Sequence, residues 1–185
     1  MKTMMDAIEL LEHDHRMVEQ LFRDYRSAAS DEQRRGVVEI LIRELSKHAA
    51  LEELTVYPLV RRLLPEMADE VDDHLDEHME VKNLLAALDR LSAGDDRESE
   101  LVARLRREVE HHVHDEETKL LPALRDAADQ AELDALGRRL RQAKSAAPTR
   151  PHPGAPNRPP ALALAAPIAA FYDRIRDRLG GRPRT

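Results

Sequence analysis

Hydrophobic residues recur every three or four positions along most of this 185-residue chain. That spacing places them on one face of a helix and leaves charged residues on the opposite face. The pattern predicts long amphipathic helices over residues 5–29, 30–65, 66–91 and 95–126, and a shorter helix over residues 129–144. The chain is therefore expected to be all-α.

Local signals mark the ends of these helices. Ser30 to Gln33 reads Ser-Asp-Glu-Gln, a capping box that starts a helix. Gly94 is a stop signal, since glycine commonly follows the last helical residue. Pro58 should kink the second helix or end it, and Pro65 closes that segment.

Two stretches of the chain repeat each other. Residues 48–58 read HAALEELTVYP and residues 112–122 read HVHDEETKLLP, with His, Glu-Glu and Pro at the same offsets. His15 and His78 form a further matched pair. Two helix hairpins joined by short loops predict an antiparallel, up-down four-helix bundle.

Composition changes after residue 145. Residues 146–161 are rich in proline and are expected to form an extended or disordered linker. Residues 162–185 combine apolar residues at helical spacing with several arginines. We expect a basic amphipathic helix there, which packs on the bundle or on a protein partner. The predicted bundle, with its short fifth helix, occupies residues 1–145.

Charge and composition exclude several classes of function. The chain has no cysteine, which excludes disulfides and thiolate metal sites. Its net charge is −7 although the tail is basic, so the body is strongly acidic and nucleic acid is not expected as a partner. We found no apolar run typical of a signal peptide or a membrane span, and therefore expect a soluble, cytoplasmic protein.

Each of the four long predicted helices carries histidine on the apolar face that should point into the bundle. On two of these helices, a histidine is followed one turn later by a glutamate. The seven residues are His15, His48, Glu52, His74, His78, His112 and Glu116. Residues four apart share a helix face, so each His-Glu pair can aim at one point. Such a cluster is costly to bury without a cation. We therefore interpret these residues as metal ligands.

The neighbouring polar residues have other expected roles. His13 and His114 are each two positions from a predicted ligand and should face solvent. His111 is also assigned to the surface, although its spacing to the following glutamate would suit a ligand pair. Glu53 and Glu117 lie off the ligand face, so they should contact the ligands from outside or form ion pairs between helices.

Ligand arithmetic predicts the number of ions. Five histidines and two bridging glutamates supply nine bonds, too many for one octahedral ion and too few for two. A bridging oxo or hydroxo group would raise the number to eleven of twelve and leave one open position for a small ligand. Mixed imidazole and carboxylate ligation suits iron, although zinc or manganese would also bind.

The ligand pattern resembles that of the hemerythrin family, which contains the HHE cation-binding domain. Residues 5–126 carry the likeness through His15, His48-xxx-Glu52, His74-xxx-His78 and His112-xxx-Glu116. The resemblance implies an up-down four-helix bundle with a non-haem di-iron centre. One iron would take His74, His78 and His112, the other His15 and His48, and Glu52 and Glu116 would bridge them.

The resemblance leaves more than one function open. One hypothesis is reversible binding of O₂ or NO for storage, delivery or sensing. Another is an enzyme that decomposes hydrogen peroxide or handles NO or iron under stress. In a third, the metal only stabilises a bundle used for protein contacts. A ferritin-like oxidase is less well supported, because that site is rich in glutamate with ExxH spacing.

Overall fold

The computed structural model describes residues 5–155 and 161–179, and within them the secondary structure is entirely helical. The elements in chain order are α1 Ala7–Ser27, α2 Asp31–Leu51, η1 Glu52–Val56, α3 Tyr57–Leu63, η2 Pro65–Met67, α4 Ala68–Asp89, α5 Glu98–Asp115, η3 Glu116–Leu120, α6 Leu121–Ala127, α7 Gln130–Lys144 and α8 Ala161–Leu179. Residues 156–160 of the predicted linker and residues 180–185 of the predicted tail lie outside the described residues.

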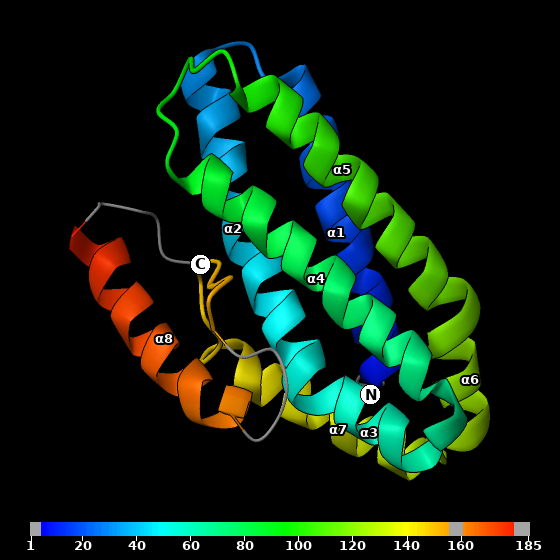
Figure 1. Ribbon diagram of the computed structural model, residues 1–185. Coiled ribbons are helices and arrows are strands. Elements are labelled where there is room, and N and C mark those ends of the chain that lie inside the picture. Colours follow the sequence, from blue (N-terminus) through cyan, green and yellow to red (C-terminus); the bar gives the residue numbers. More distant parts are fainter. Residues whose placement is uncertain (1–4, 156–160, 180–185) are drawn as a thin grey trace.

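The four long helices form the expected bundle. Helices α1 and α2 pack as one hairpin, α4 and α5 pack as the other, and α2 contacts α4 (Figure 1). The core has two apolar clusters, one at each end of the bundle. On α1, Leu11 belongs to one cluster and Val18 to the other, with His15 between them. The histidines therefore occupy a polar layer between two hydrophobic cores.

The second helix does not end at Pro58. The chain stays helical through both repeated prolines, because a wider π-helical turn, η1 or η3, precedes each of them. In η1 the N–H of Tyr57 donates to the carbonyl of Glu52, five residues earlier. Proline lacks an N–H and its ring clashes with the carbonyl four residues back, so the wider turn accommodates it. Each π turn begins at a predicted ligand, Glu52 or Glu116.

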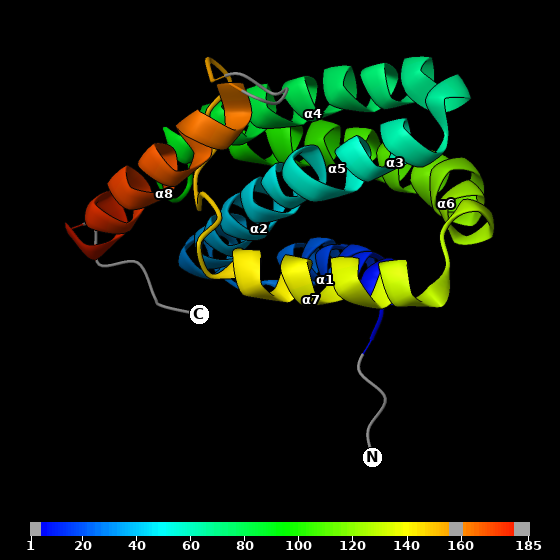
Figure 2. The same cartoon turned by 90° about the horizontal axis from the view of Figure 1, so that it is seen from below.

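Helix α7 lies along α1 and closes the lower side of the bundle (Figure 2). The two helices approach closely at Gly137, where a β-carbon would lie 2.9 Å from the backbone carbon of Asp6 and 3.0 Å from the nitrogen of Ala7. Only a residue without a side chain fits this contact without a shift of one helix.

Gly137→Ala should lower the free energy of unfolding by about 1–3 kcal/mol, because the added methyl overpacks α7 against the start of α1. Gly36→Ala is the matched control. Gly36 lies within α2, and a β-carbon added there would have no atom within 4 Å, so alanine should raise stability by up to about 1 kcal/mol. Urea unfolding measures both changes. Equal stabilisation by the two variants would contradict the close contact.

The chain after α7 is held against the bundle before α8 begins. The buried carboxylate of Asp173 in α8 accepts hydrogen bonds from the backbone N–H groups of Thr149 and Arg150 at 3.0 Å. The Arg150 guanidinium is also buried and pairs with Asp89 of α4 at 2.8 Å and Asp177 of α8 at 2.7 Å. This part of the proline-rich segment is therefore anchored by buried ion pairs. Among the described residues, no helix is long and apolar enough to cross a membrane.

Candidate metal centre

All seven predicted ligand residues lie buried in the polar layer of the bundle. Glu52 and Glu116 are completely inaccessible to solvent, and His48, the most exposed of the set, is 8% exposed. They come from α1, from α2 with η1, from α4, and from α5 with η3. Of the three histidines assigned to the surface, His111 is exposed, and His13 and His114 likewise lie outside the buried layer.

His15, His48, Glu52 and Glu116 form one group of converging side chains, with ligand atoms all within 4.8 Å of one another. The Nε2 atoms of His15 and His48 are 3.2 Å apart. Nε2 of His15 is 3.3 Å from Oε2 of Glu116, and Nε2 of His48 is 3.0 Å from Oε1 of Glu52. Four atoms suited to a cation thus surround one small region.

Glu52, His78 and His112 form a second group on the other side of Glu52. The Nε2 atoms of His78 and His112 are 3.2 Å apart, and Nε2 of His78 is 3.2 Å from Oε2 of Glu52. Glu52 therefore presents one oxygen to each group. Oε2 of Glu116 lies 3.8 Å from Nε2 of His112 as well as close to the first group. Each of the two glutamates therefore lies close to histidines of both groups.

The arrangement of these side chains suits ligation of metal ions better than direct hydrogen bonds between the side chains. Both carboxylate oxygens of Glu52 and Oε2 of Glu116 are buried and have no hydrogen-bond partner among the described residues, although imidazole nitrogens are near. An unsatisfied buried carboxylate is strongly unfavourable. Two nitrogens bound at right angles to one ion, each at about 2.1 Å, would be separated by roughly 3 Å. The observed spacing of the imidazole pairs is close to that value.

Other glutamates hold the histidine rings in place from outside the groups. Nδ1 of His15 lies 2.8 Å from Oε1 of Glu117, and Nδ1 of His78 lies 3.0 Å from Oε1 of Glu53. Glu53 also pairs with Lys82 at 2.7 Å, which neutralises its buried charge. An Nδ1–H that donates to a carboxylate leaves Nε2 as the acceptor, the state in which imidazole binds a metal. Glu53 and Glu117 thus have the outer role expected from their positions.

In the metal-free protein, neighbouring charged groups shift the pKa values of the histidines and glutamates of the polar layer. Burial lowers the pKa of His15, but the nearby carboxylates of Glu116 and Glu117 outweigh burial and raise this pKa to about 10. For His78, burial is likewise outweighed by the two glutamates of η1, and its pKa rises to about 9. Burial raises the pKa of Glu52, but His48 and His78 hold it well below its usual value. Without a cation, protons take its place on these rings.

His74 lies apart from both groups. Its Nδ1 is 3.1 Å from Oε2 of Glu77 and 3.2 Å from Nδ1 of His112, on the opposite edge of the His112 ring from the second group. It forms a third group with Glu77 and His112. Ligation by His74 would require its ring to turn, and stays a prediction.

Two further residues, which were not predicted from the sequence, contact the candidate ligands. The hydroxyl of Tyr57 lies 3.2 Å from Nε2 of His78 and donates to Oε1 of Glu116 at 3.3 Å. Burial and the nearby Glu52 and Glu116 raise the pKa of Tyr57 well above its usual value, so the phenol keeps its proton. The residue at the matching position of the second repeat is Leu121. The signal in the sequence was therefore a tyrosine, with its polar hydroxyl, where the other repeat has an apolar residue.

The second such residue is Glu77. Its Oε2 lies 2.7 Å from Nδ1 of His112, so it orients that ring as Glu53 and Glu117 orient theirs. The sequence feature that could have identified Glu77 is its position three residues after His74, which places it on the same helical face.

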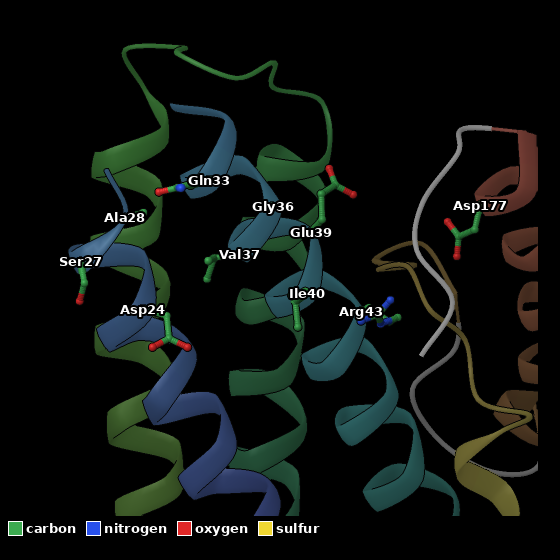
Figure 3. Close-up of a pocket in the computed structure, with 10 residues that line it drawn as sticks. All are labelled: Asp24, Ser27, Ala28, Gln33, Gly36, Val37, Glu39, Ile40, Arg43 and Asp177. Atoms are coloured by element: carbon green, nitrogen blue, oxygen red, sulfur yellow. The ribbon is translucent and has the colours of Figure 1, made fainter. Parts of the chain in front are cut away.

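A cavity of about 20 Å³ adjoins the centre. It is lined by four of the histidines and by small apolar side chains: His15, His48, His78, His112, Val18, Leu45, Ala49, Val81, Val109 and Val113. A larger hollow of about 530 Å³ lies elsewhere, along α2 and the end of α1, and its lining includes Asp177 of α8 (Figure 3). No histidine among the described residues lines this larger hollow, so it is separate from the centre.

A helical bundle with a buried cluster of histidine and glutamate has the ligands that could hold a metal cation. The family of the hemerythrin HHE cation-binding domain matches residues 6–124 and, a second time, residues 70–179. The chain therefore belongs to this family. The second match begins at the second helix hairpin, in agreement with the internal repeat, and it extends to the end of α8.

Individual relatives support the same assignment. A hemerythrin-like protein of Schizosaccharomyces pombe is 28% identical over 165 residues, which cover 89% of this chain and 81% of that protein. A crystal structure of a hemerythrin HHE cation-binding domain protein from Mycobacterium kansasii covers 76% of this chain and 86% of its own, with a TM-score of 0.65 and 24% identity. That likeness supports the fold. The similarity to the family reaches beyond residues 5–126, the range expected from the ligand pattern.

His74→Leu should lower bound metal less than His78→Leu does. His78 presents Nε2 to Glu52 within the second group, whereas His74 lies outside it and its repeat counterpart is already a leucine, Leu11. Metal analysis of the two purified variants, with circular dichroism to verify folding, measures the difference. Equal loss from both would establish His74 as a full ligand.

Proposed function

We propose that this protein holds two iron ions in the polar layer and reversibly binds O₂ or NO for storage, delivery or sensing. His15 and His48 would hold one ion, His78 and His112 the other, with Glu52 and Glu116 as bridges and an oxo or hydroxo group between the ions. Mixed imidazole and carboxylate ligation without thiolate supports iron. Iron, when bound, supplies the redox-active centre at which a diatomic molecule attaches.

The cavity of about 20 Å³ beside the histidines carries this proposal. A space of roughly 10–15 Å³ is enough for one water-sized molecule, so this cavity has room for one diatomic ligand and excludes an organic substrate. Apart from the histidines, its lining consists of valine, leucine and alanine. Such a lining favours an apolar guest such as O₂ or NO over a guest that needs several hydrogen bonds.

The protein residues would control the conditions of binding. Val109 and the other apolar side chains exclude water from the cavity, and the buried imidazoles present neutral nitrogens to the metals. Glu53 and Glu117 hold two of those rings in the required tautomer. A dry pocket with fixed ligands favours reversible attachment, because it limits proton delivery and ligand exchange.

One observation favours a second candidate, the decomposition of hydrogen peroxide. The Tyr57 hydroxyl is buried, keeps its proton and donates to Glu116, so a proton source lies beside the proposed ions. Peroxide chemistry requires proton movement between oxygen atoms, which a phenol–carboxylate pair can provide. The volume of the cavity does not separate the two candidates, whereas its apolar lining favours the diatomic.

Ala49→Val should weaken O₂ binding roughly tenfold or more while the iron content stays unchanged, since overpacking costs about 1–3 kcal/mol. Ala49 lines the cavity, and its neighbour Ala50, also buried, lines a different one, so Ala50→Val is the matched control. Iron-loaded protein is reduced without air and titrated with O₂ while the absorption spectrum is recorded.

Removal of O₂ should restore the starting spectrum. An absence of spectral change, or equal effects of the two variants, would overturn the proposal. Rapid loss of added peroxide that disappears in Tyr57→Phe would favour the enzyme instead.

A further inference from the structure

An acidic hollow lies on the outer surface of the bundle between α4 and α5, close to the buried centre. It encloses about 340 Å³, and its lining carries five carboxylates, from Glu70, Asp73, Asp76, Glu77 and Asp115. The cation of the lining is Lys119, which pairs with Asp115 at 2.8 Å and lies 3.7 Å from Glu70. The remaining acidic charge attracts cations to this place.

Three residues of this hollow converge as metal ligands do. Glu77, His111 and Asp115 each offer an atom within 4.8 Å of the other two, and Nε2 of His111 is 3.5 Å from Oε1 of Glu77. The side chain of His111 is 62% exposed and can meet an incoming ion. An imidazole with two carboxylates suits a divalent transition metal better than Ca²⁺ or Mg²⁺. Lys119 is half-exposed and would yield its place beside Asp115 to a divalent ion.

A separate observation at the same hollow points to a ligand. Nε2 of His74 is buried and has no hydrogen-bond partner among the residues described. His74 is only 1% exposed yet contributes to the lining, with Nε2 3.9 Å from Oε1 of Glu70, another lining residue. A buried imidazole nitrogen without a partner is unfavourable, and a passing cation would satisfy it.

The candidate ligand groups overlap from the surface to the centre. Glu77 belongs to the surface group with His111 and Asp115 and also to the group with His74 and His112. Its Oε1 lies toward His111, and its Oε2 lies 2.7 Å from Nδ1 of His112. His112 in turn belongs to the second group of the centre. An ion can therefore exchange ligands in steps without losing all of them at once.

We propose that Glu77, His111 and Asp115 form a surface site that captures a divalent transition-metal ion and delivers it past His74 to the buried centre. The carboxylates raise the local concentration of the ion, and His111 favours a transition metal. Glu77 then transfers the ion to the group that contains His74 and His112. The capture site is distinct from the proposed centre, which contains none of these three residues. It would bind an ion whether or not the loaded centre binds O₂.

Binding at the surface is tested with Zn²⁺ and the iron-loaded protein in equilibrium dialysis. We expect one additional ion per chain in the wild type, bound at least about tenfold more weakly in His111→Ala and Asp115→Asn. His114→Ala is the matched control, since His114 lies on the same helix but outside the hollow. If no additional ion binds, or if His111→Ala binds it as the wild type does, the site does not exist.

Delivery is tested by adding Fe²⁺ to the metal-free protein without air and measuring over time the fraction protected from a ferrous chelator. His111→Ala and Asp115→Asn should slow protection at least about fivefold, and His74→Leu should slow it as well. The final iron content of the His111 and Asp115 variants should equal that of the wild type. Uptake at the wild-type rate in all three variants would overturn the route, even if the surface ion binds.

Discussion

Glu52→Ala should reduce the iron bound to the purified protein from the proposed two ions per chain to fewer than one. Glu52 is the residue shared by the two ligand groups, with Oε1 toward His48 and Oε2 toward His78. Its loss removes one ligand from each proposed ion and the bridge that keeps the ions together. A single histidine variant removes a bond from one ion, so Glu52→Ala should have the larger effect.

His114→Ala is the control for this experiment, because its side chain lies outside the buried layer and its loss should leave both ions in place. Metal analysis gives the iron content, and far-ultraviolet circular dichroism shows whether the bundle remains helical. We expect helicity to persist, because the two apolar clusters that form the core of the bundle do not include Glu52. Retention of two ions in a folded Glu52→Ala protein would falsify the shared-ligand arrangement.

Helical geometry alone was enough to predict which histidines and glutamates lie together in the bundle. His15, His48 and His112 lie at the same level of the bundle because the repeat places each hairpin in the same register. A helix presents residues four apart on one face, so the two His-Glu pairs could be identified without coordinates.

The sequence predicted less where packing selects between alternatives. His74 has the correct spacing to His78, yet its ring lies beside Glu77, and the Tyr57 ring stacks against it with 6.1 Å between centroids. Spacing defines which face a residue occupies but not its rotamer or the neighbour that competes for the same space. Pro58 was expected to kink or end its helix, but the chain stays helical there because a π turn precedes the proline.

The tail illustrates a further limit of pattern reading. Proline content predicted a linker, which stays a prediction. It gave no sign that the Arg150 guanidinium would pair with Asp89 and Asp177, or that Asp173 would accept a hydrogen bond from the Arg150 backbone N–H. These partners are 23 to 61 residues distant in the chain. Composition reports local conformational preference, whereas such buried pairs depend on tertiary structure.

The metal-free protein and the iron-loaded protein should respond to pH in opposite directions. Between pH 6.5 and about 9, the melting temperature of the metal-free protein should fall by on the order of 5 °C, whereas that of the loaded protein should not fall. The reason lies in the protons that the ligand rings bind when the metal is removed.

In the metal-free protein the pKa values of His15, His74 and His78 are raised above the ordinary value of 6.5, to about 10 for His15 and about 9 for His78. A raised pKa means that the folded state binds protons more tightly than the unfolded state does. The resulting stability is fully present below pH 6.5 and is lost as pH rises toward 9 and 10. His112 acts in the opposite sense, since burial lowers its pKa, but it is one group against three.

Bound iron reverses this dependence because metal and protons compete for the same nitrogen atoms. Rising pH removes the protons, strengthens metal binding and so stabilises the folded state by linkage. His15→Gln should flatten the slope of the metal-free protein, and His13→Gln, two residues earlier and outside the buried layer, should leave it unchanged. Differential scanning calorimetry of both forms at pH 6.5, 7.5 and 9 measures the slopes. A metal-free protein that becomes more stable over this range would show that protons on the histidine rings do not stabilise the metal-free centre.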